Sequence, residues 1–125
     1  MSVTSRRIAF WSAVAAWAGV IFFMSSVPGS ELPGRIPPEL GHFSEYFVLG
    51  VLLYLALLAD LPPRRALALA IVLASMYGVT DEFHQRFVVM RTPDVKDWAM
   101  DTAGALTGAG IALIALGRRA VKSRD

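Results

Sequence analysis

The chain has 125 residues, of which 55% are hydrophobic and only 18% are charged, and its mean hydropathy is +0.53. A soluble domain of this size would be expected to carry more charge, so the composition indicates a small membrane protein, with residues 1–125 forming a single domain. The net charge of +2 is too small to favour nucleic acid as a partner, and the absence of cysteine excludes disulfides and thiolate metal ligands.

Four apolar segments predict four helices that cross the lipid bilayer. In chain order they cover about residues 8–27, 42–60, 65–85 and 97–117. The first and last approach the ~20 residues needed to cross ~30 Å of hydrocarbon. The middle two reach that length only if their polar ends, residues 42–46 and 81–85, belong to the helices. The sequence therefore predicts an all-α, antiparallel four-helix bundle in which some polar residues lie within the membrane.

Proline and glycine mark the connections between these segments. Helix-breaking residues stand at 28–34, 37–38, 62–63 and 93. Asp97 is expected to cap the last helix, and the basic tail after Gly117 is expected to be frayed. The first apolar run is longer than that of a cleavable signal peptide, and no Ala-x-Ala-like site follows it. We therefore expect the first segment to be retained as a transmembrane helix.

The basic residues predict the orientation of the chain. With four spans, one side would hold both termini and the turn between the second and third segments. Of the 12 basic residues, that side would hold Arg6, Arg7, Arg64, Arg65, Arg118, Arg119, Lys122 and Arg124, and the other side Arg35, Arg86, Arg91 and Lys96. The positive-inside rule then places both termini in the cytoplasm and makes the protein a multi-pass protein of the inner (plasma) membrane.

Three clusters of ionisable residues fall at the outer ends of the segments, at residues 42–46, 81–85 and 97–101. Charged groups near hydrocarbon are costly, so they are seldom found there without a partner or a task. At 1.5 Å per residue, Glu45, Asp81 and Asp101 lie about 22, 24 and 26 Å from the cytoplasmic ends of their helices. The sequence thus predicts one outward-facing polar site, with its carboxylates at similar depth.

Helical spacing assigns these side chains to faces. Residues 42, 45 and 46 share one face, residues 81, 84 and 85 a second, and Asp97 and Asp101 a third that continues through Gly104 and Gly108. The Gly-x-x-x-Gly pair allows another helix to approach closely. The polar end of that third face is therefore expected to point at neighbouring helices and not at lipid.

Three blocks of the sequence carry a resemblance to a known family. Residues 42–50 fit His-Phe-x-Glu-Tyr-x-x-Leu-Gly, residues 77–87 fit Tyr-x-x-x-Asp-Glu-x-His-Gln-x-Phe, and residues 91–108 begin with Arg91 and continue to the Asp-x-x-x-Asp-x-x-Gly-x-x-x-Gly run. Together they resemble the VanZ-like membrane proteins over roughly residues 8–117. Pro38-Glu39 and Val89-Met90 depart from the Asp-Lys and Pro-Gly that family members often carry there.

The resemblance implies a bacterial membrane protein with four helices. The family's namesake is associated with resistance to teicoplanin, a glycopeptide that bears a lipid chain. The lipid bilayer is one expected partner, and an amphiphilic envelope lipid or a lipoglycopeptide antibiotic is another. The sequence identifies neither a cofactor nor an oligomeric state.

Three interpretations of the polar site remain open. The first is recognition of, or chemistry on, an amphiphile whose acyl part lies among Phe43, Phe47, Phe83 and Phe87. Binding candidates are Tyr46, Gln85, Arg86, Arg91 and Asp97. Catalytic candidates are His42, Glu45, Asp81, Glu82, His84 and Asp101. In a hydrolase or transferase, His84 or His42 would act as general base and would be oriented by Asp81 or Glu45.

The other two interpretations need no amphiphile. A metal site could use the two imidazole–carboxylate pairs His42/Glu45 and Asp81/His84, with Glu82 and Asp101 as further ligands. A purely structural cluster would instead pair the carboxylates and imidazoles with Arg86 or Arg91 and so fasten the helix ends together.

Overall fold

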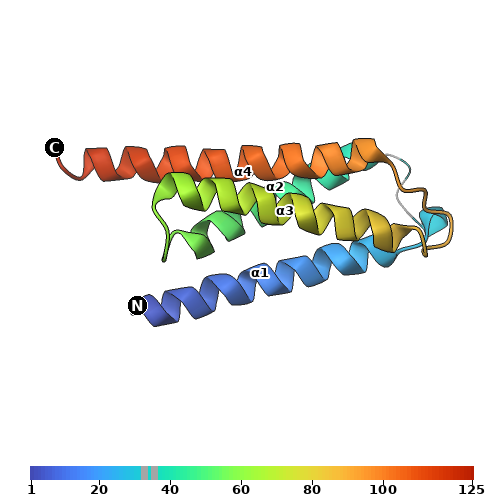
Figure 1. The fold of residues 1–125 in the computed structure, drawn as a ribbon, viewed down its shortest axis with the longest axis horizontal. Helices are drawn as coiled ribbons and strands as arrows, with labels where there is room; N and C mark the ends of the chain where they lie inside the picture. The colour runs from blue at the N-terminus through green and yellow to red at the C-terminus, as the bar shows by residue number, and fades with distance from the viewer. Residues whose placement is uncertain (32–33, 35–36) are drawn as a thin grey trace.

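The structure is a computed structural model that describes residues 1–31, 34 and 37–125. Its helices are α1 (Val3–Ser26), α2 (Pro38–Leu57), α3 (Pro63–Gln85) and α4 (Val95–Lys122), with a short 3-10 helix, η1 (Gly29–Glu31), after α1. The helices run up and down, so both termini and the α2–α3 turn lie at one end, and η1 and the α3–α4 connection lie at the opposite end (Figure 1). The predicted all-α, antiparallel fold is confirmed.

All four helices are long and apolar enough to cross a membrane. Pro38 and Pro63 stand at the first position of α2 and α3, where a missing N–H breaks no helical hydrogen bond. Both middle helices include their polar residues, 42–46 in α2 and 81–85 in α3. The prediction that these polar groups belong to the helices is confirmed.

Two predictions for the last helix were wrong. Asp94, whose side chain accepts a hydrogen bond from the Lys96 N–H, caps α4 in place of Asp97. Asp94 has the extended backbone that a capping residue needs, which leaves Asp97 inside the first turn. The helix also continues to Lys122 and does not fray after Gly117, and the basic residues of its last turn complement the helix dipole.

The α2–α4 pair has the most extensive contacts in the bundle. A Cβ added to Gly104 would overlap the carbonyl oxygen of Phe43, and one added to Gly108 would overlap that of Phe47. Gly50 of α2 lies just as close to the α4 backbone. The predicted close approach at Gly104 and Gly108 is confirmed, and it brings the polar start of α2 against the polar start of α4.

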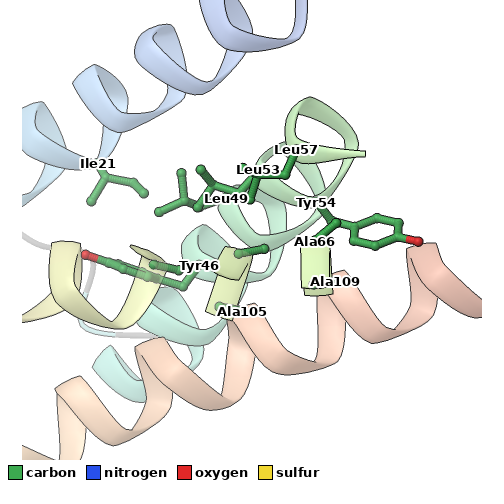
Figure 2. Close-up of a cluster of buried hydrophobic side chains, with 11 residues drawn as sticks. Ile21, Tyr46, Leu49, Leu53, Tyr54, Leu57, Ala66, Ala105 and Ala109 are labelled. Carbon is green, nitrogen blue, oxygen red and sulfur yellow. The ribbon is translucent and has the colours of Figure 1, made fainter. Parts of the chain in front are cut away.

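The apolar core is arranged around α2. Figure 2 shows Leu49 and Leu53 on the side of α2 that faces Ile21 of α1, with Ala105 and Ala109 of α4 on the other side. Small residues at these interfaces allow close packing of helices in a membrane. Helix α1 contacts α2 and α3 and is mostly exposed, which suits a helix that borders lipid.

The α3–α4 connection contains a residue in the left-handed region, Met90, with φ of 57°. A non-glycine residue there is disfavoured by about 1–2 kcal/mol. The connection is tied to η1, because the Gly29 N–H donates to the Val89 carbonyl at 3.1 Å. Two residues after Val89, Arg91 lies against the end of α1 and donates to its carbonyl oxygens.

Candidate functional site

A buried histidine of α2 lies between two carboxylates of α4. The Nδ1 atom of His42 is 2.7 Å from Oδ1 of Asp101, and its Nε2 atom is 3.6 Å from Oδ2 of Asp97. The first distance is a hydrogen bond, whereas the second is an electrostatic contact only. Asp97 and Asp101 are one helical turn apart, so they flank the imidazole. Asp101 has no exposed surface.

Helix α3 adds two more carboxylates to this region. Asp81 is buried and its Oδ2 atom accepts a hydrogen bond of 3.4 Å from the Tyr46 hydroxyl. Glu82 uses Oε2 to accept the backbone N–H of Asp94 at 3.0 Å. Gly78, one turn before Glu82, leaves room for Asp101, since an added Cβ would be 3.0 Å from Asp101 Oδ2. We call His42, Tyr46, Asp81, Glu82, Asp97 and Asp101 the polar cluster.

Two oxygen atoms in the polar cluster are buried and lack a hydrogen-bond partner among the residues that the structure describes. They are Oδ2 of Asp101 and Oε1 of Glu82. A buried carboxylate oxygen without a partner is destabilising. One atom each from His42, Glu82 and Asp101 lies within 4.8 Å of the others, close enough for the three residues to bind one metal ion. Glu45, Asp81 and His84, the other expected metal ligands, do not belong to that group.

His84 lies outside the polar cluster, on the side of α3 that faces α1. Its ring stacks on Phe22 with a centroid distance of 4.3 Å, and its Nε2 atom is 3.4 Å from Oγ of Ser26. As a general base, His84 was expected to be oriented by Asp81, but the Asp81 carboxylate accepts a hydrogen bond from Tyr46 instead. Within the polar cluster, His42 is the imidazole paired with a carboxylate.

Arg91 joins the α3–α4 connection to the end of α1. Its guanidinium donates to the carbonyl oxygens of Met24 and Val27 at 2.9 and 3.1 Å. These carbonyls belong to the end of α1, where the last carbonyl groups of a helix have no regular i+4 partner. Arg86 is exposed and lies 5.9 Å from the centroid of the Phe83 ring. Within the described part of the chain, neither arginine forms the ion pair with a carboxylate that a structural cluster was expected to use.

The remaining predicted site residues lie beside the polar cluster. Glu45 is half-buried, and its backbone carbonyl accepts a hydrogen bond of 2.8 Å from the Trp17 indole. Gln85, the last residue of α3, is buried. The sequence analysis missed the part played by α1, whose residues Trp17 and Ser26 contact Glu45 and His84. The hydrogen-bonding side chains of Trp17 and Ser26 within the apolar first segment could have indicated that this segment contacts the site.

The family comparison agrees with this architecture. The model of the VanZ/LLP1 family matches residues 10–116, which include the whole polar cluster. No curated protein and no solved structure matches the chain. With four helices that can cross a membrane and a family match over most of its length, the chain belongs to the VanZ/LLP1 family and is a multi-pass membrane protein.

Proposed function

We propose that this protein binds an amphiphilic molecule of the cell envelope, with the head group at the polar cluster and the acyl chain on neighbouring apolar surface. The observation that carries the proposal is a pair of buried carboxylate oxygens, on Glu82 and Asp101, for which the described residues supply no hydrogen-bond partner. Ionisable groups within membrane helices are costly, so a poorly satisfied one supports the hypothesis of a functional site. A head group rich in hydrogen-bond donors would satisfy them.

An apolar surface suited to an acyl chain lies at the same end of the bundle. Phe83 and Phe87 are 59% and 75% exposed and their rings pack edge to face, 5.6 Å apart. Phe83 follows Glu82 directly in α3, so the exposed ring and the carboxylate lie at the same level of the helix on different faces. Phe43 and Phe47, the other expected acyl contacts, are half-buried and line the α2–α4 interface with their backbone. The exposed pair is therefore the better contact for a lipid chain.

The proposed location is the plasma membrane, with both termini in the cytoplasm and the polar cluster at the outer leaflet. The uneven distribution of arginine and lysine supports this orientation. Because the chain lacks cysteine, single cysteines introduced by mutation can be used to determine the orientation by chemical labelling. In intact cells, a membrane-impermeant maleimide is expected to label Thr92→Cys, and to label Ser123→Cys only after lysis. Both positions are exposed, at opposite ends of the bundle. The reverse labelling pattern would refute the orientation.

By its family, the protein is proposed to protect bacteria from a lipid-bearing glycopeptide of the teicoplanin type. In a sensitive host, expression should raise the inhibitory concentration of teicoplanin more than that of a glycopeptide without an acyl chain. Glu82→Gln and Asp81→Asn are expected to abolish this protection. Glu39→Gln removes the same charge from an exposed residue at the same end and should retain it. Equal protection by all three variants would refute the assignment of the site.

An enzymatic alternative is favoured by one contact, the 2.7 Å hydrogen bond between His42 and Asp101. A carboxylate that orients an imidazole in this way is typical of a general base. Mass spectrometry of envelope lipids from cells with and without the protein separates the two functions. Binding leaves the lipids chemically unchanged, whereas a hydrolase or transferase changes the mass of a lipid, and the change is lost in His42→Gln.

A further inference from the structure

The polar cluster gathers more carboxyl groups than basic partners among the described residues. Four carboxylates, those of Asp81, Glu82, Asp97 and Asp101, gather around one imidazole. Among the described residues, the ion pairs at this end of the bundle involve His42 and no arginine or lysine. Several carboxylates beside hydrocarbon repel one another and are poorly solvated. A cation bound between them would remove both penalties.

The unpartnered oxygens show where such a cation would bind. Asp101 is fully buried and directs one oxygen to His42, which leaves Oδ2 without a described partner. Glu82 directs one oxygen to the Asp94 N–H, which leaves Oε1 equally unpartnered. The ligand atoms of His42, Glu82 and Asp101 lie within 4.8 Å of one another, so small side-chain movements bring all three to one ion.

We propose that His42, Glu82 and Asp101 form a binding site for a single divalent transition-metal cation, zinc or manganese. Two carboxylates balance the charge of a divalent ion while the imidazole remains neutral. One nitrogen and two oxygen ligands suit zinc and manganese better than calcium or magnesium, which prefer oxygen alone. The three ligands come from α2, α3 and α4, so the ion would also join these helices.

In this metal site Asp97 would not bind the ion itself but would orient the His42 ring. Metal-bound histidines direct their second ring nitrogen to a carboxylate, which fixes the tautomer. With the metal on Nδ1 of His42, in place of the hydrogen bond to Asp101 Oδ1, the Nε2 atom faces Asp97 Oδ2 at 3.6 Å. A slight movement would make this contact a hydrogen bond. The ion would occupy the two carboxylate oxygens that the proposed function assigns to a head group, so the head group would then contact the polar cluster through the ion. The test below uses no amphiphile, so its failure can be told apart from failure of the proposed function.

The test measures metal bound to purified, detergent-solubilised protein without any added amphiphile. The protein is stripped with a chelator, incubated with zinc or manganese, freed of excess ion and measured by elemental mass spectrometry. The wild type is expected to retain about one ion per chain, as three protein ligands to one ion imply. Asp101→Asn and Glu82→Gln should lose stoichiometric binding, and Asp97→Asn should bind about 10- to 100-fold more weakly. Glu39→Gln, an exposed acid at the same end, should bind like the wild type.

If the ligand variants fail to fold, the effect of metal on the thermal unfolding temperature of the folded proteins provides a second test. Zinc should raise the thermal unfolding temperature of the wild type and of Glu39→Gln, and magnesium at equal concentration should not. The proposal is overturned if the wild type retains no stoichiometric zinc or manganese. It is also overturned if folded Asp101→Asn and Glu82→Gln retain the wild-type affinity.

Discussion

Alanine at Gly104 or Gly108 is expected to be among the most destabilising single changes in the chain. The new methyl group would overlap the carbonyl oxygen of Phe43 or Phe47, and a backbone atom cannot rotate away as a side chain can. Overpacking of this kind typically costs about 1–3 kcal/mol, and more where the structure cannot relax. Helices α2 and α4 would have to separate, which would also pull His42 away from Asp101.

The same helix provides the control for this prediction. Gly110 has no described atom within 4 Å of an added Cβ, so Gly110→Ala meets no obstacle there. It should be neutral or slightly stabilising, because alanine favours a helix by about 0.5–1 kcal/mol over glycine. Thermal unfolding in detergent, followed by circular dichroism, measures all three variants. If Gly104→Ala and Gly110→Ala unfold at the same temperature, the close α2–α4 approach is wrong.

Removal of His42 is expected to destabilise the protein more than removal of its partner Asp101. His42→Leu leaves the Asp101 carboxylate fully buried without the imidazole, and a broken buried pair typically costs about 3–5 kcal/mol. Asp101→Leu leaves an imidazole that can still turn to Asp97, 3.6 Å away. The second change should therefore be the milder of the two.

The double variant His42→Leu/Asp101→Leu should be more stable than the sum of the two single changes implies, because no buried charge is left without its partner. Ser75→Ala provides a reference without charged groups, since it removes the 2.9 Å hydrogen bond between the Ser75 and Thr102 hydroxyls that joins α3 to α4. That change should cost about 0.5–1.5 kcal/mol. Chemical denaturation of the purified metal-free proteins measures these differences, and additive effects of the two leucine changes would contradict the direct His42–Asp101 contact.

The sequence predicts the helices and the close α2–α4 approach because both depend on local patterns. Apolar length identifies the spans, and the spacing of Gly104 and Gly108 identifies the face that packs. The start of α4 was mispredicted because Asp94 and Asp97 are both good capping residues, and the backbone conformation decides between them.

Partner choice within the site could not be read from the sequence. Spacing places Asp81 and His84 on one face of α3, yet Asp81 is bonded to Tyr46 of α2 and His84 packs on Phe22 of α1. Two residues on one face can contact different helices when that face lies between them. Likewise, Arg91 donates to carbonyl oxygens of α1, and a backbone acceptor leaves no trace in the pattern of charged side chains.

Native mass spectrometry of the protein extracted from bacterial membranes in a mild detergent tests the central claim most directly. That claim is that the polar cluster binds the head group of an envelope amphiphile. The wild type and Glu39→Gln are expected to carry one amphiphile of defined mass, and folded Asp81→Asn and Glu82→Gln are expected to lose it. If all four proteins carry the same mixture of bulk membrane lipids, the polar cluster does not bind a specific amphiphile and the account is wrong.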